Sequence, residues 1–253
     1  MLRRLAQRTL EKAGLGTYSG RVELGFELLL RIQRLRSRSP FYVIQVGAQD
    51  GVTGDPIRER VLSEGWHGAL VEPRRAIFEQ LRRNYSGQQG LSFVNAAICE
   101  SNGMRTLHAL DASDPSLPLW AHGLGTFDLE TLLRHEAELP GLRDRLVTET
   151  VVCRTWQSLL EEARPRKVDL LQVDAEGMDY ELVRTFPLAR VRPGLIRYEH
   201  KLLSHGDRTA CEDYLVTSGY VPVVERYDTC AIATGWQLPE SEGARLAHDR
   251  RQP

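Results

Sequence analysis

The chain has 253 residues, a formal net charge of −1 at pH 7, and 42% hydrophobic and 26% charged residues. This composition is that of a globular protein and excludes a largely disordered chain. The nearly balanced charge disfavours a nucleic-acid partner, and no apolar run approaches the roughly 20 residues that a membrane span needs.

The N-terminus and the cysteines indicate the compartment. The first residues include arginines but have neither a continuous apolar core nor a small-residue cleavage site. We therefore expect no secretory signal and a cytoplasmic protein. The four cysteines are far apart, with no pair at the spacing of zinc or redox motifs, so we expect free thiols.

The first 39 residues are more basic than the chain as a whole. Nine Lys and Arg residues against three Glu residues give them a net charge of +6. Their apolar residues recur at helical spacing and are interrupted by Gly14, Gly16 and Gly20. This pattern predicts two short helices, and hence a basic helical arm over residues 1–39 that is suited to contact with a partner or an acidic surface.

From residue 40 onward, short apolar strands alternate with helices. The first part predicts strands at 41–46, 68–72 and 91–96, with helices at 56–62 and 74–85 between them. The later strands are predicted at 168–173, 195–199, 220–224 and 229–233, and the last two form an antiparallel hairpin at one edge. The alternation predicts an α/β fold with a mostly parallel, doubly wound seven-stranded sheet and helices on both faces.

Residues 111–150 interrupt this alternation. They contain a loop with two prolines, followed by a segment at 128–138 that has the pattern of a helix. We expect this insertion to form a lid over a substrate. The domain as a whole is then predicted to extend over residues 40–238, with a flexible tail at 239–253.

Glycines and carboxylates follow the predicted parallel strands. In such sheets the ligand binds at the carboxyl ends of the strands, where Gly47, Gly51, Glu72, Asp174 and Glu176 are expected to converge. Glu72 comes 25 residues after Gly47, near the interval at which an acidic residue binds ribose hydroxyls. The pattern therefore predicts a nucleoside cofactor.

The loop after the first strand distinguishes between such cofactors. It lacks the three glycines that seat a pyrophosphate, and Asp50 lies where that anion would bind. A nicotinamide-dependent oxidoreductase is therefore the weaker alternative. Asp50, Asp55 and Asp174 suit a cationic cofactor instead, such as S-adenosylmethionine with its sulfonium and ammonium groups.

Six segments, taken in this order and spacing, resemble the FkbM-type methyltransferases over residues 41–233. They are residues 44–51 with Asp55-Pro56, residues 66–73, residues 95–98, residues 125–128, residues 168–177 and residues 198–201. The resemblance implies a Rossmann-like class I methyltransferase fold and S-adenosylmethionine as methyl donor. It also implies a hydroxyl acceptor, commonly on a sugar, glycan or natural product.

The resemblance also implies roles for individual residues. Glu72 would hold the ribose, Asn95 and Ala96 would lie near the adenine, and Asp174 with Glu176 would line the floor where donor and acceptor meet. Many relatives have an acidic residue where this chain has Gln45, so Asp50 or Asp174 is expected to face the methionine ammonium. The predicted cofactor-binding residues are Gln45, Gly47, Ala48, Asp50, Gly51, Asp55, Glu72, Pro73, Asn95, Ala96, Thr126, Asp174 and Glu176.

Methyl transfer to an alcohol needs a group that accepts the hydroxyl proton. His200, at a strand end, is the predicted general base, and Glu199 would orient it or replace it, with Asp174 nearby. A magnesium ion on Asp174, Glu176, Glu199 and His200 is an alternative that their spacing does not require.

Several of these residues also have purely structural interpretations. Asp174 and Glu176 could cap the following helix, His200 could be a buried structural histidine, and Trp120 and Phe127 could pack the lid rather than an acceptor ring. A binding module that has kept the fold without the activity remains an alternative. The sequence leaves the acceptor, the use of a metal and the formation of a homo-oligomer open.

Overall fold

The computed structural model describes residues 25–37 and 40–235. The predicted helix in residues 1–24 and the predicted tail at 239–253 lie outside this described part. No helix of the described ranges is long and apolar enough to cross a membrane.

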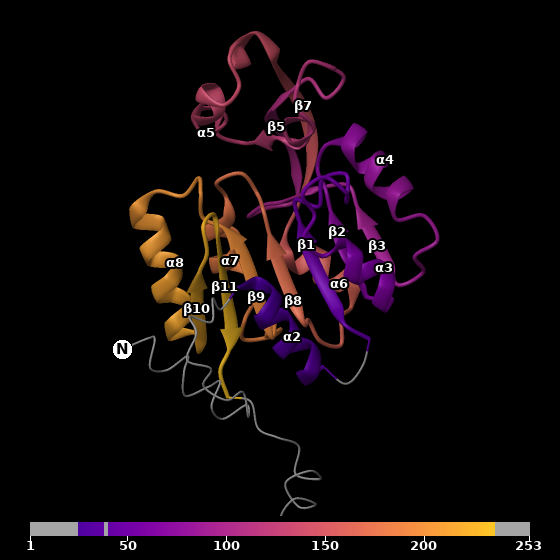
Figure 1. Cartoon of the computed structure of the whole chain (residues 1–253), viewed down its shortest axis with the longest axis vertical. Helices are drawn as coiled ribbons and strands as arrows, with labels where there is room; N and C mark the ends of the chain where they lie inside the picture. The colour runs from indigo at the N-terminus through magenta and orange to yellow at the C-terminus, as the bar shows by residue number, and fades with distance from the viewer. Residues whose placement is uncertain (1–24, 38–39, 236–253) are drawn as a thin grey trace, which may run out of the picture.

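A seven-stranded sheet forms the centre of the molecule, in the order β10-β11-β9-β8-β1-β2-β3 (Figure 1). Its neighbouring strands are parallel except for β11, which is antiparallel to both β9 and β10. The bounds are β1 Tyr42–Val46, β2 His67–Val71, β3 Leu91–Val94, β8 Leu170–Val173, β9 Leu195–Glu199, β10 Tyr220–Val224 and β11 Asp228–Ala233. This confirms the predicted class I methyltransferase arrangement. The strand order reverses between β1 and β8, so a crevice is expected at the carboxyl ends of these two strands.

Helices cover both faces of this sheet, as predicted. One face carries α2 Phe26–Arg36, α3 Arg58–Glu64 and α4 Arg75–Asn84, and the other carries α6 Trp156–Ala163, α7 Asp179–Thr185 and α8 His205–Thr217. Successive strand residues point to opposite faces, so Val43 packs with the first group of helices and Ile44 with the second. Burial on both sides explains why these strands are almost continuously apolar in sequence.

The described part of the predicted basic arm is α2. Phe26, Leu29 and Leu30 of this helix are buried in the core that also contains Val43 and Ile232 of the sheet. This segment is therefore packed against the central sheet.

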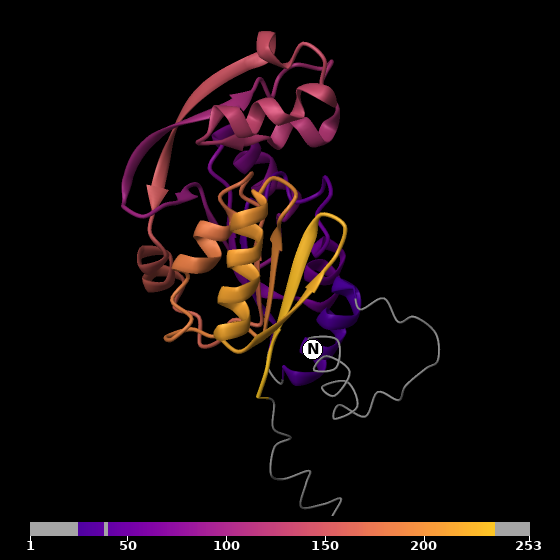
Figure 2. The same cartoon turned by 90° about the vertical axis from the view of Figure 1, so that its left-hand side faces the viewer.

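A second, four-stranded sheet has the order β4-β7-β5-β6 and belongs to residues 97–154, which we call the inserted region (Figure 2). Its strands are β4 Ala97–Ile98, β5 Gly103–Leu110, β6 Gly125–Thr126 and β7 Leu146–Arg154. Its helical turns are η1 Leu119–Gly123, α5 Leu129–Leu133, η2 Arg134–Ala137 and η3 Leu142–Arg145.

The inserted region differs from the sequence prediction in two ways. The long strands β5 and β7 pair antiparallel from Gly103↔Cys153 to Leu110↔Leu146, whereas the sequence analysis predicted neither of them. The helix predicted at 128–138 consists of α5 followed by the 3-10 turn η2. The first four residues of β5 are exposed, so this strand lacks the continuous apolar pattern of the central strands.

Candidate functional site

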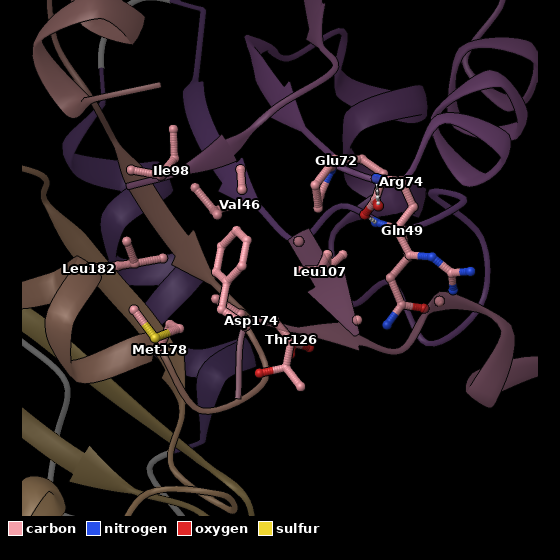
Figure 3. A pocket seen from close by; sticks show the side chains of 17 residues that line it. Val46, Gln49, Glu72, Arg74, Ile98, Leu107, Thr126, Asp174, Met178 and Leu182 are labelled. Carbon is pink, nitrogen blue, oxygen red and sulfur yellow. Dashed lines mark hydrogen bonds between the residues drawn. The ribbon is translucent and has the colours of Figure 1, made fainter. Parts of the chain in front are cut away.

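One pocket lies where the carboxyl ends of β1, β2 and β8 meet the inserted region (Figure 3). It contains about 570 Å³ of empty space, part of which is open to solvent. Of the predicted site residues, those that line it are Gly47, Glu72, Pro73, Thr126 and Asp174. The lining residues that the sequence analysis did not select are Val46, Gln49, Arg74, Ala97, Ile98, Leu107, Gly123, Gly125, Phe127, Ala175, Met178 and Leu182.

The glycine at the end of β1 permits a close approach of two backbone segments. Gly47 has a φ of +74°, and a Cβ at this position would lie 1.8 Å from the carbonyl oxygen of Asp174. Only glycine fits this contact between the β1 and β8 loops. The loop continues through Gln49, which also has a positive φ of 45°.

Glu72 follows β2 and is buried against the pocket. Its carboxylate accepts hydrogen bonds from the backbone N–H of Arg74 at 2.8 Å and of Gln49 at 3.1 Å. Burial is the main cause that raises its pKa to about 7, and the two hydrogen bonds and the Arg74 charge oppose this effect. Each carboxylate oxygen keeps a lone pair that could accept a ligand hydroxyl.

Arg74 joins the central sheet to the inserted region. Its buried guanidinium group pairs with Glu149 of β7 at 2.6 Å and donates to the carbonyl oxygens of Leu110, His122 and Leu124. Two of these carbonyl oxygens, those of His122 and Leu124, belong to neighbours of the pocket-lining residues Gly123 and Gly125. The sequence signal for this role is weak: Arg74 precedes a helix, where the helix dipole disfavours a cation.

One side of the pocket is apolar. Figure 3 shows Glu72, Arg74 and Gln49 grouped on one side, with Ile98, Met178 and Leu182 on the other. The full apolar lining is Val46, Ala97, Ile98, Leu107, Phe127, Met178 and Leu182. Such a surface suits a planar aromatic base.

Two residues that were predicted to lie near the adenine of the cofactor do not line the pocket. The amide of Asn95 donates to the carbonyl oxygens of Glu72 and Pro73, both at 2.9 Å, and so fixes the loop after β2. Ala96 is buried in the core, and the next two residues, Ala97 and Ile98, line the pocket instead.

Asp50 and Asp55 are bound within the loop after β1. Asp50 accepts hydrogen bonds from the backbone of Val52 and Thr53 at 2.8 and 2.7 Å. Asp55 accepts from the Tyr85 hydroxyl at 2.8 Å. Neither carboxylate lines the pocket.

Three further predicted residues, one at the end of β1 and two in this loop, do not line the pocket either. The buried Gln45 amide donates to Asp55 at 3.4 Å. Ala48 is buried in the core beneath α3 and α4, and Gly51 packs against Tyr85. The structure therefore separates these residues from Glu72 and Asp174.

Four carboxylates gather at the carboxyl ends of β8 and β9: Asp174, Glu176, Asp179 and Glu199. Asp179 is fully buried and accepts hydrogen bonds from the backbone N–H groups of Ala175, Gly177 and Glu199. It thereby joins the loop after β8 to the end of β9.

The pKa values of three of these groups are raised. Burial, followed by repulsion from Glu176, raises the pKa of Asp179 to about 7 and that of Glu199 to about 8, and the same causes raise that of Asp174. In the described residues, no group of three or more His, Cys, Asp or Glu side chains is arranged to hold a metal ion. The magnesium alternative on Asp174, Glu176 and Glu199 therefore has no supporting geometry here.

His200, the predicted general base, packs against β11. Its Nδ1 lies 2.9 Å from the Thr229 hydroxyl, its backbone N–H donates to the Tyr227 carbonyl oxygen, and the side chain does not line the pocket. Burial, and to a lesser extent the Arg208 charge, lowers its pKa. These contacts match the structural interpretation of this histidine.

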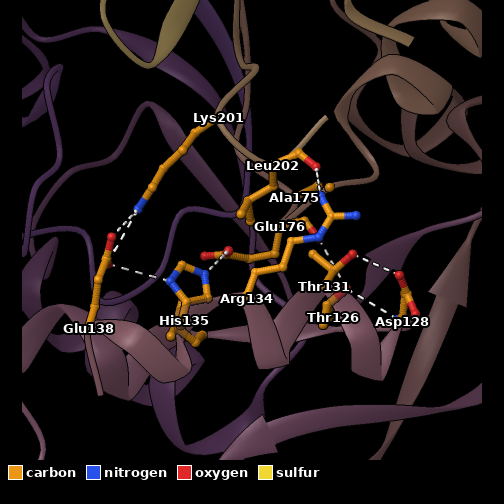
Figure 4. A network of polar contacts seen from close by, with 12 residues as sticks. Thr126, Asp128, Thr131, Arg134, His135, Glu138, Ala175, Glu176, Lys201 and Leu202 are labelled. Carbon is orange, nitrogen blue, oxygen red and sulfur yellow. Dashed lines mark hydrogen bonds and ion pairs between the residues drawn. The ribbon is translucent and has the colours of Figure 1, made fainter. Parts of the chain in front are cut away.

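Polar contacts also connect the inserted region with the loops after β8 and β9 (Figure 4). The Thr126 hydroxyl donates to the Glu176 carbonyl oxygen at 3.0 Å, and Arg134 donates to the Leu202 carbonyl oxygen at 2.6 Å. Lys201 pairs with Glu138 at 3.3 Å. Together with the contacts of Arg74 after β2, these contacts join the inserted region to the central domain at two places.

Comparisons with known proteins give one family and several distant structures. The family model described as "Methyltransferase FkbM domain" matches residues 45–217, more than half of the chain. No curated protein matches the sequence. A crystal structure of a methyltransferase FkbM from Methylobacillus flagellatus KT is 12% identical, with a TM-score of 0.45 over 76% of this chain and 43% of that chain.

Two further solved structures are similarly distant. A precorrin-6y C5,15-methyltransferase from Geobacter metallireducens GS-15 is 12% identical, with a TM-score of 0.42 over 86% of this chain and 94% of that chain. The N-terminal domain of human METTL16 is 10% identical, with a TM-score of 0.46 over 83% and 68%.

Proposed function

The chain belongs to the FkbM family of S-adenosylmethionine-dependent methyltransferases, and from this premise we propose that it methylates a hydroxyl group on a sugar, glycan or natural-product acceptor. The observation that carries the proposal is the pocket that Glu72 and Asp174 line together with an apolar surface. A nucleoside with a cationic side arm has the matching chemistry.

The lining residues fit the methyl donor in three respects. Glu72 can accept hydrogen bonds from the ribose hydroxyls, and the surface around Ile98, Phe127 and Leu182 suits the adenine. Asp174 lines the same pocket, and its carboxylate accepts no hydrogen bond from the described residues, so it is available to a cation. Gln45 is bound to Asp55 and does not compete for this role.

S-adenosylmethionine supplies an electrophilic methyl group on a sulfonium sulfur. The residues of the pocket would hold the donor and the acceptor hydroxyl close together, and such positioning supplies most of the acceleration in a displacement of this kind. As the oxygen–methyl bond forms and the carbon–sulfur bond breaks, the hydroxyl proton must pass to a base. We assign this role to Asp174 and Glu199, because Asp174 lines the pocket and burial raises the pKa of Glu199 to about 8, near the operating pH.

Binding and turnover experiments test this proposal. S-adenosylhomocysteine should raise the melting temperature of the protein, and NAD should not. Glu72→Gln should weaken S-adenosylhomocysteine binding about tenfold or more, because a charge-assisted hydrogen bond is worth roughly 1.5–3 kcal/mol. Asp50→Asn is the matched control and should bind normally, since Asp50 caps its own turn.

Transfer of a radiolabelled methyl group to a panel of glycan, lipid-linked and polyketide hydroxyls then identifies the acceptor. With an acceptor in hand, Asp174→Asn should lower turnover by about 10²-fold or more, the usual contribution of a proton-transfer group, whereas His200→Ala should retain most of it. Loss of turnover in His200→Ala with normal donor binding would restore His200 as the base and overturn our assignment.

A further inference from the structure

The carboxylates at the ends of β8 and β9 lack cations of their own. The two cations that act on them are engaged elsewhere: Arg197 pairs with Asp228 at 2.8 Å, and Lys201 pairs with Glu138. Among the described residues, nothing donates a hydrogen bond to the carboxylates of Asp174 or Glu199. Protons rather than cations of the chain therefore neutralise part of this site, and the raised pKa values of Asp174, Asp179 and Glu199 reflect this; a bound cation would take the place of those protons.

His135, from η2 of the inserted region, extends toward the carboxylates at the ends of β8 and β9. Its side chain is only 6% exposed, and its Nε2 lies 3.6 Å from the Glu176 carboxylate, which is beyond hydrogen-bond distance (Figure 4). This buried ring nitrogen has no hydrogen-bond partner. A buried polar atom without a hydrogen-bond partner lowers the stability of the fold. A bound ligand that supplied the missing hydrogen bond would remove this cost.

An aromatic ring lies next to this histidine. The rings of Trp120, on η1, and His135 have centroids 5.8 Å apart, and Trp120 is 37% exposed. A partly exposed indole ring can bind an ammonium group through cation–π attraction or pack against a sugar ring.

We propose that Glu176, Glu199, His135 and Trp120 form an acceptor subsite that binds a hydroxyl compound carrying a protonated amine, the chemistry of an amino sugar. The ammonium group is held by Glu176 and Glu199 and packs against Trp120. A neighbouring hydroxyl group of the same ligand is the partner of His135 Nε2, which can donate or accept depending on its tautomer. This inference rests on the proposed function, and it selects one class among the acceptors that function allows.

The negative charges of these carboxylates disfavour acceptors that are themselves anionic. A carboxylate or phosphate on the acceptor would approach four acidic side chains in a half-buried site, where screening by solvent is weak. Anionic sugars should therefore bind worst. This ordering of cationic, neutral and anionic ligands is the measurable consequence of the subsite.

The test uses the full chain saturated with S-adenosylhomocysteine and three matched probes: glucosamine, glucose and glucuronic acid. Binding is followed by the ¹⁵N–¹H signal of the Trp120 indole, assigned with Trp120→Phe. Glucosamine should shift this signal with a dissociation constant at least about tenfold below that of glucose, a difference of ~1.4 kcal/mol. Glucuronic acid should bind more weakly than glucose.

Two variants locate the effect. Glu176→Gln should bring the glucosamine and glucose constants within about twofold of each other, a difference under ~0.5 kcal/mol. Glu138→Gln is the control, because Glu138 also faces His135 but is half exposed and paired with Lys201. It should keep the preference for glucosamine.

Three outcomes would overturn the subsite: equal binding of glucosamine and glucose, a preference retained in Glu176→Gln, or no shift with any of the probes. Failure of S-adenosylhomocysteine to bind in the first step would instead contradict the proposed function. The two failures are therefore distinguishable.

Discussion

The central sheet and the inserted region meet at the pocket, but they are stabilised differently. Strands β1 and β8 are covered by helices on both faces, and Val43 and Ile44, which point in opposite directions, are both fully buried. The inserted region has two small apolar clusters of its own, and the first residues of β5 are exposed. The central sheet thus depends on its interior, whereas the position of the inserted region depends on its attachments.

The contacts that attach the inserted region to the central domain differ in how deeply they are buried. Arg74 is buried and contacts four residues of the inserted region, whereas the side chains of the Lys201–Glu138 pair are 31% and 51% exposed. Buried charged groups are costly to leave unpaired, and exposed ion pairs contribute little. We therefore expect Arg74 to set the position of the inserted region over the pocket.

Replacement of Arg74 should have the largest effect. Arg74→Met leaves Glu149 and the carbonyl oxygens of Leu110 and Leu124 without their donor, so we expect the free energy of unfolding to fall by roughly 3–5 kcal/mol. The affinity for S-adenosylhomocysteine should fall as well, because Gly123 and Thr126 line the pocket beside these carbonyls. Urea unfolding and calorimetric titration measure the two effects.

Arg75→Met is the matched control. Its side chain is 72% exposed, and its contacts with Glu79 and the Phe78 ring both stay within α4, so we expect a change within about 0.5 kcal/mol. If Arg74→Met changed the unfolding free energy as little as Arg75→Met, other contacts would hold the inserted region. The expectation that Arg74 sets its position would then be wrong.

The next largest effect is expected at Gly47, within the central domain. Gly47→Ala places a Cβ against the Asp174 carbonyl oxygen and also forces alanine into a positive φ. The strain alone costs about 1–3 kcal/mol, and separation of the β1 and β8 loops should weaken donor binding further.

Gly54→Ala separates these two causes. Gly54 has a φ of +68° but nothing lies within 4 Å of a Cβ built there, so this variant carries only the backbone strain. Equal unfolding free energies for the two variants would show that the loops after β1 and β8 can move apart without cost.

The sequence predicted the central domain better than the inserted region for a physical reason. Strands buried on both faces are continuously apolar, and their glycine and acidic ends mark the carboxyl edge, as at Gly47, Glu72 and Asp174. The strands β5 and β7 are half exposed and pair across the 35 residues that separate Leu110 from Leu146, so no short window of sequence indicates their pairing.

The residues of the candidate site also divide into those that the sequence could indicate and those that it could not. Gly47 and Glu72, whose predicted roles depend on backbone position, line the pocket. Asp50 was selected for its charge and its place in the loop, but its carboxylate is bound within its own turn. Arg74 could not be selected, because its partners come from parts of the inserted region that are distant in sequence.

The third prediction concerns pH and compares the two sides of the pocket. Burial raises the pKa of Glu72 to about 7 from 4.5, and only its ionised form accepts two ribose hydroxyls. Affinity for S-adenosylhomocysteine should therefore rise with pH and level off above about 7, by up to about tenfold per pH unit below that point. Calorimetric titrations over about three pH units around neutrality measure the slope.

Glu72→Gln should flatten this profile. The stability of the protein has the opposite dependence: the buried carboxylate favours its neutral form, so the contribution of Glu72 to the unfolding free energy falls as pH rises from 4.5 to about 7. If the slope of the binding profile persisted in Glu72→Gln, it would belong to the carboxylates near Asp174 on the other side of the pocket.

The smallest effect is expected at the exposed attachment. Lys201→Met removes the ion pair with Glu138, and because both side chains reach solvent we expect the unfolding free energy to change by under about 1 kcal/mol. A double-mutant cycle with Glu138→Gln measures the pair itself, and its coupling energy should decrease as salt is added, since exposed charges are screened. A salt-independent coupling comparable to the effect of Arg74→Met would mean that the rim contact, rather than the buried arginine, holds the inserted region over the pocket.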